Sequence, residues 1–111
     1  MHRTLIIARL KTDQPEKIAD VFAESDATEL PHLVGVNRRT LFTFHDLYIH
    51  LVEADEDINP SLYRARSHPL YKDINTRLAE LVYPYDPNWA EPKDAMARPF
   101  YVWSAKDGRL Q

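Results

Sequence analysis

Apolar residues recur along the chain with two spacings, and each spacing predicts one kind of element. Short runs of Leu, Ile, Val and aromatic residues between polar flanks indicate strands, whereas apolar residues three and four positions apart indicate helices. The predicted strands are residues 3–11, 33–44, 47–54 and 99–104, and the predicted helices are residues 14–29 and the stretches introduced by Pro60 and Pro69. We expect Asp13 to cap the first helix, with Glu16 completing a capping box. Residues 83–87 must break the last helix, and residues 86–98 are expected to be irregular.

The order of these elements is strand, helix, strand, strand, helix, strand. This is the split β-α-β arrangement of a ferredoxin-like α+β fold with one four-stranded antiparallel sheet. The chain has 111 residues and contains no internal repeat or low-complexity linker, so we expect a single domain over residues 1–111.

Both faces of the predicted strands carry large apolar groups. In the first strand, Leu5 and Ile7 alternate with Ile6 and Ala8, and residues 47–54 alternate in the same way. Helices on one side of a sheet leave its other face open, and soluble monomers rarely expose a wide apolar face. We therefore predict a homodimer, a dimeric α+β barrel, in which the open sheet faces pack together. The alternative is a monomer in which residues 86–98 cover the open face.

Composition narrows the function classes. The chain is 44% hydrophobic and 28% charged, as in ordinary soluble proteins, and its formal net charge of −3 argues against binding to duplex nucleic acid. The absence of cysteine excludes disulfides, iron–sulfur clusters and a cysteine nucleophile. The N-terminal apolar run is broken by Arg9, too early for a membrane span, and no signal cleavage site follows, so we expect a cytoplasmic protein. Two glycines cannot supply a phosphate loop, and the five histidines form no HExxH motif, so neither a cofactor nor a metal is predicted.

Asp26 is the first candidate for chemistry. It follows Phe22 by one turn of the predicted helix, so it falls on the inner face. A partly buried carboxyl in that place suits a general acid or base. The alternative is that the end of the helix unwinds and exposes Asp26 to solvent.

Arg39 and His50 are the next candidates. A two-residue turn at His45 and Asp46 would make Arg39 and His50 diagonal neighbours on one sheet face, roughly 7–8 Å apart at Cα. A cation and an imidazole could then address one ligand oxygen. A three-residue loop would separate them, and a packed sheet histidine is the alternative reading of His50. Tyr48, on the His50 face, is either a lining residue or proton donor for a flat phenolic ligand, or simply part of the sheet packing.

Five segments carry a resemblance to a known family. They are SDATELP at residues 25–31, GVNRR at 35–39, LFTFHDLYIHLVEAD at 41–55, ARSHPL at 65–70 and FYVW at 100–103. In this order they closely resemble the tetracenomycin-type aromatic polyketide cyclases of bacterial type II polyketide pathways. The resemblance extends over nearly the whole chain, and its central block is long and distinctive.

The resemblance implies a ferredoxin-like homodimer without metal or organic cofactor. Such enzymes fold poly-β-keto intermediates and close late rings by intramolecular aldol condensation and loss of water. The implied pocket residues fall on Asp26, Arg39 and His50, with Asp26 or His50 moving protons and Arg39 binding the developing oxyanion. Some members have histidine where this chain has Ser25, which argues against a mechanism that requires two histidines and leaves Asp26 and His50 as the main acid–base candidates. Ser25 and Tyr48 are the substrate-binding candidates. The implied partner is an aromatic polyketide intermediate, with transient contact with the type II synthase or its acyl carrier protein.

Two other functions remain open. Dimeric ferredoxin-like proteins also include cofactor-free oxygenases that act on anthrones, and these consume oxygen where a cyclase releases water. Alternatively, the dimer is a non-catalytic subunit that holds the polyketide for a neighbouring synthase. In that case substitution of Asp26, Arg39 or His50 would leave the products unchanged whenever binding is retained.

Overall fold

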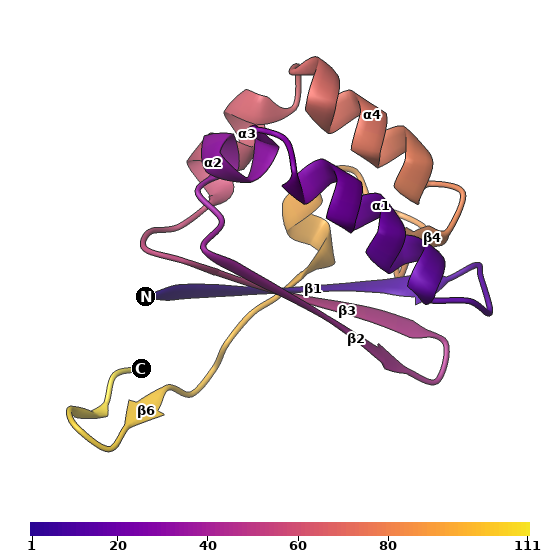
Figure 1. Cartoon of the computed structure of the whole chain (residues 1–111). Helices are drawn as coiled ribbons and strands as arrows, with labels where there is room; N and C mark the ends of the chain where they lie inside the picture. Colours follow the sequence, from indigo (N-terminus) through magenta and orange to yellow (C-terminus); the bar gives the residue numbers. More distant parts are fainter.

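The computed structural model describes residues 1–111 and shows one antiparallel sheet with all its helices on one face (Figure 1). The sheet strands are β1 His2–Leu10, β2 Arg38–Phe44, β3 Leu47–Ala54, β4 Val82–Pro84 and the short β5 Met96–Ala97. The helices are α1 Glu16–Asp26, α2 Leu30–Val34, α3 Asn59–Ala65, α4 Pro69–Leu78 and the 3₁₀ turn η1 Pro92–Ala95. The strand order β2-β3-β1-β4, with every pair antiparallel, confirms the predicted ferredoxin-like fold.

The β2–β3 hairpin has the predicted register. Phe44 pairs with Leu47 across a two-residue turn, so Leu41 lies opposite His50 and Arg39 opposite Val52, as the sequence predicts. His45 adopts a φ of 55°, in the left-handed region that tight hairpin turns use. This register is what places Arg39 and His50 on the same side of the sheet.

The start of α1 differs from the prediction. The N-cap is Pro15, which offers no side-chain oxygen, and neither Asp13 nor Glu16 makes a capping hydrogen bond. The Thr12 hydroxyl instead accepts from the backbone N–H of Gln14 at 3.0 Å. This local turn delays the helix beyond the position that Asp13 could cap, so the predicted capping box is wrong.

The second strand is shorter than predicted. The predicted strand 33–44 begins in the structure as α2, and β2 starts only at Arg38. Pro31 lies in the first turn of α2, and Gly35 ends the helix with a φ of 90°. The backbone N–H of Gly35 donates to the carbonyl of Pro31 at 2.8 Å. A proline in the first turn and a left-handed glycine after the last turn together favour one turn of helix over an extended chain.

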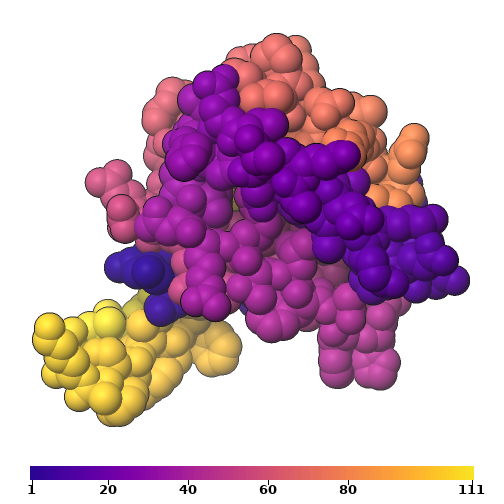
Figure 2. Space-filling model, viewed as in Figure 1, coloured from indigo at the N-terminus to yellow at the C-terminus, as the bar shows by residue number.

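The fourth strand is not the one predicted. β4 follows α4 closely and occupies the sheet edge beside β1, where the absence of an N–H on Pro84 is tolerated. The predicted strand 99–104 instead belongs to a separate arm, in which β6 Trp103–Ser104 pairs only with β7 Gly108–Arg109. Figure 2 shows this arm, in yellow, standing away from the body of the molecule.

The open face of the sheet is not covered by residues 86–98. Within this segment, η1 lies on the side of the sheet that carries the helices and β5 pairs with β1 in the sheet itself, so the monomer alternative is wrong on this point. The open face leaves Phe42 and Phe44 47% and 60% exposed. None of the helices is long and apolar enough to cross a membrane.

Candidate active site

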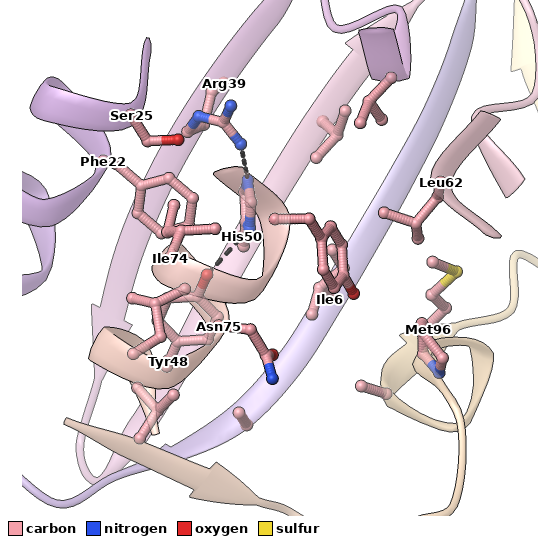
Figure 3. A pocket seen from close by; sticks show the side chains of 18 of the residues that line it. Ile6, Phe22, Ser25, Arg39, Tyr48, His50, Leu62, Ile74, Asn75 and Met96 are labelled. Carbon is pink, nitrogen blue, oxygen red and sulfur yellow. Dashed lines mark hydrogen bonds between the residues drawn. The ribbon is translucent and has the colours of Figure 1, made fainter. Parts of the chain in front are cut away.

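A cavity of about 440 Å³ lies between the sheet and the helix layer. It is lined by 26 residues, of which 19 are hydrophobic, so it suits a ligand with large apolar surfaces. Strands β1 and β3 form its floor, the neighbouring helices α1 and α4 cover it, and Met96 at the end of η1 closes a further side (Figure 3). Few polar groups interrupt this lining.

The main polar groups of the cavity form a chain centred on His50. Tyr48 and His50 are two residues apart in β3, so both side chains leave the same face of the sheet. The Tyr48 hydroxyl lies 2.9 Å from Nδ1 of His50, and Nη1 of Arg39 lies 3.0 Å from Nε2 of the same ring (Figure 3). His50 and Tyr48 are only 5% and 6% exposed, so both hydrogen bonds are shielded from water.

Asp26 extends this chain to the surface. It is the last residue of α1, and its carboxylate accepts from Arg39 Nη2 at 2.7 Å and from Arg39 Nε at 3.0 Å. The Asp26 side chain is 39% exposed and does not line the cavity, whereas the Arg39 side chain is 14% exposed and does. The prediction of an inward-facing, partly buried carboxyl is therefore wrong. The last turn of α1 directs Asp26 toward the outer side of Arg39.

Burial controls the ionisation of the two innermost groups. Burial, assisted by the positive charge of Arg39, lowers the pKa of His50 from 6.5 to about 3, so the imidazole is neutral near pH 7. Burial also raises the pKa of Tyr48 above its ordinary value, although Arg39 opposes the rise. Tyr48 therefore keeps its proton near pH 7, and Arg39 carries the positive charge of the cavity.

The phenyl ring of Phe22 packs against the side chains of Arg39 and His50. The Arg39 guanidinium carbon lies 4.6 Å from the centroid of the Phe22 ring, and the His50 ring meets the same phenyl edge-on at 5.1 Å. The apolar spacing in the sequence places Phe22 only on the buried face of a helix. The sequence could have indicated the contact of Phe22 with Arg39, because Phe22 lies one turn before Asp26 and both residues then point toward Arg39.

Ser25, a substrate-binding residue predicted from the sequence, lines the cavity and lies beside Arg39 in Figure 3. Other wall residues were not predicted. Asn75 of α4 adds a polar group, and Trp89 and Met96 add apolar surface from the segment that the pattern leaves irregular. Nothing in the local sequence indicates that this segment folds back over the sheet. No group of three or more His, Cys, Asp or Glu side chains is arranged to hold a metal ion.

The fold and the cavity define a ferredoxin-like α+β protein with a largely apolar cavity and a mostly buried arginine in its wall. The sequence matches the family model described as polyketide synthesis cyclase over residues 2–104. The chain belongs to this family, which confirms the resemblance to tetracenomycin-type cyclases, and its role is that of a polyketide cyclase.

Two curated relatives and a solved structure agree with this assignment. The chain is 50% identical to tetracenomycin F2 cyclase of Streptomyces glaucescens, over 96% of this chain and 97% of the relative. It is 47% identical to polyketide synthase CurG of Streptomyces cyaneus, over 93% of this chain and 97% of the relative. The structure of the Streptomyces glaucescens tetracenomycin F2 cyclase, described as a type-II polyketide cyclase, superposes with a TM-score of 0.88, covering 95% of this chain and 99% of the other.

Proposed function

We propose that this protein closes a late ring of a polycyclic aromatic polyketide by intramolecular aldol condensation and dehydration, without metal or organic cofactor. The observation that carries the proposal is a largely apolar cavity with one guanidinium in its wall, Arg39. Apolar walls fit a partly aromatic substrate, and the cation fits an oxygen that becomes negative during the reaction.

This aldol condensation does not require a strong base. A CH₂ group between two carbonyls loses a proton readily, and the resulting enolate carbon attacks a second carbonyl carbon of the same molecule. The carbonyl oxygen gains negative charge and takes up a proton, and the resulting hydroxyl then leaves as water together with a hydrogen of the adjacent carbon. Holding the reacting carbons together can supply roughly 7–11 kcal/mol of the barrier, so the shape of the cavity carries much of the catalysis.

Arg39 stabilises the oxyanion of the developing enolate in this proposal. Asp26 and His50 were the expected proton carriers, but their contacts favour a different role. The Asp26 carboxylate is bound to Arg39 outside the cavity, and the Nε2 lone pair of His50 accepts from Arg39. We infer that both residues hold the guanidinium in position, so that it does not reorganise when charge appears on the substrate.

The proposal is tested with purified protein and a partly cyclised aromatic polyketide, under anaerobic conditions and without added cofactor. We expect a product lighter than the substrate by one water molecule, detected by mass spectrometry. Conversion that begins only when oxygen is admitted, with oxygen gained by the product, would identify the anthrone-type oxygenase instead. Tight binding without conversion in either atmosphere would identify the non-catalytic holding protein.

We also propose that the protein is a homodimer whose open sheet faces pack together. No helix covers this face (Figure 1), and Phe42 is 47% exposed on it.

Sedimentation at tens of micromolar should give about 26 kDa, twice the 13.0 kDa of one chain. Phe42→Lys would place like charges near each other across a two-fold axis and should give the monomer. Leu33→Lys, on α2 and 43% exposed, is the matched control and should stay dimeric. A wild-type monomer would refute this assembly.

A further inference from the structure

We propose that the hydroxyl of Tyr48 donates the proton to the substrate carbonyl oxygen, and that neutral His50 aims it by donating to the same hydroxyl. The proposal rests on the function proposed above and assigns one of its steps to a named atom. It is carried by the direction of the hydrogen bonds in the buried chain from Arg39 to Tyr48.

The direction follows from which groups can only donate. A guanidinium has five N–H groups and no acceptor, so the 3.0 Å contact between Arg39 Nη1 and His50 Nε2 requires a lone pair on Nε2. A neutral imidazole carries a single N–H, which must then be on Nδ1. Nδ1 of His50 lies 2.9 Å from the Tyr48 oxygen, so His50 donates and Tyr48 accepts.

This arrangement leaves the Tyr48 O–H proton without a protein partner. The Nδ1 atom of His50 is the only hydrogen-bonding partner of the Tyr48 oxygen, and in this tautomer it cannot accept. Tyr48 is 6% exposed and lines the cavity, so its hydroxyl has little access to bulk water. A buried donor without an acceptor is unfavourable, and an oxygen of a bound ligand would satisfy it.

Two donors then flank one imidazole ring. Arg39 and Tyr48 contact opposite nitrogens of His50, from its two sides (Figure 3). A poly-β-keto chain carries oxygens on alternate carbons, so it can present one oxygen to the guanidinium and another to the phenol. In this pose Arg39 stabilises the enolate oxygen and Tyr48 protonates the oxygen of the carbonyl under attack.

The proton transfers balance with solvent as the only other participant. The acidic CH₂ group loses its proton to solvent as the enolate binds beside Arg39. As the carbon–carbon bond forms, the carbonyl π electrons move onto oxygen, which takes the Tyr48 proton. The resulting phenolate keeps its hydrogen bond from His50 Nδ1 and regains a proton from solvent when the product leaves. Tyr48 thus returns to its starting state, and nothing is oxidised or reduced.

The tautomer can be tested without any substrate. We expect ¹⁵N NMR of histidine-labelled protein to show that His50 is protonated on Nδ1 and unprotonated on Nε2 from pH 5 to 8. The signal is assigned by its loss in a His50→Gln variant. A proton on Nε2, or an imidazolium at pH 6, would overturn the relay whether or not the protein proves to be a cyclase.

The donor is tested by Tyr48→Phe, with Tyr63→Phe as the control. Tyr63 of α3 is a half-buried tyrosine outside the cavity, and its hydroxyl donates to Glu91 at 2.8 Å. We expect Tyr48→Phe to lower kcat roughly 100-fold with KM changed only a few-fold, and Tyr63→Phe to stay near the wild type. A Tyr48→Phe enzyme within threefold of the wild-type kcat would overturn the proposal while the wild type still cyclises.

A second substitution covers the case in which Tyr48→Phe does not fold. 3-Fluorotyrosine at position 48 keeps the hydroxyl and makes it a stronger acid, so we expect a measurable change in kcat, with KM little altered. An unchanged kcat would show that proton donation by this hydroxyl does not contribute to the rate. Inactive wild-type protein would count against the proposed function, and the NMR measurement would still decide the hydrogen-bond direction.

Discussion

An Arg39→Ala variant should close the polyketide ring roughly 10³-fold more slowly than the wild type. Arg39 is the positive charge of a cavity lined mainly by apolar groups, and its field is strong there because little water screens it. Removing it leaves the developing oxyanion without its principal partner. Initial rates of water loss, followed by mass spectrometry at saturating substrate, measure the effect.

Arg77→Ala is the matched control for this variant. Arg77 also pairs with a carboxylate, Glu24, but it joins α4 to α1 outside the cavity. Its removal should leave the rate within about twofold of the wild type, as for an ordinary surface ion pair. Arg39→Lys should fall between the two, because lysine keeps the charge but loses the fork that holds Asp26 and His50 together. An Arg39→Ala rate within tenfold of the wild type would refute oxyanion stabilisation as the main role of Arg39.

The sequence could predict the part of the site that depends on strand register. Strand alternation and a two-residue turn at His45 and Asp46 place Arg39, Tyr48 and His50 on one face, and the structure has that register. Such a prediction works because a shift of one residue in the strand pairing would move every side chain of the strand to the opposite face of the sheet.

The sequence could not predict where helix ends and long loops place their side chains. Asp26 lies on the last turn of α1, where a small change in direction decides between cavity and solvent. Trp89 and Met96 reach the cavity through a segment held mainly by contacts remote in sequence. The fourth strand was missed because β4 is only three residues long and ends in Pro84, so it carries almost no strand pattern.

Acid should destabilise the protein through His50. The pKa of His50 is about 3 in the folded protein because of burial and the nearby Arg39, against 6.5 in the unfolded chain. Between these values the unfolded chain binds a proton that the folded protein does not. Stability is therefore complete above pH 6.5 and falls as the pH decreases toward 3. Between pH 7.5 and 4.5 this group alone should remove about 3 kcal/mol from the free energy of unfolding.

His50→Gln isolates this contribution. The glutamine oxygen can accept from Arg39 near the position of Nε2, but the amide does not titrate. Urea unfolding at pH 7.5 and pH 4.5 should therefore show a loss of stability in the variant that is smaller by about 3 kcal/mol than in the wild type. His32→Gln, at an exposed position on α2, should lose as much as the wild type. Equal losses in the wild type and His50→Gln would mean that His50 is already protonated in the folded protein. The hydrogen bonds from Arg39 through His50 to Tyr48 would then have different donors and acceptors.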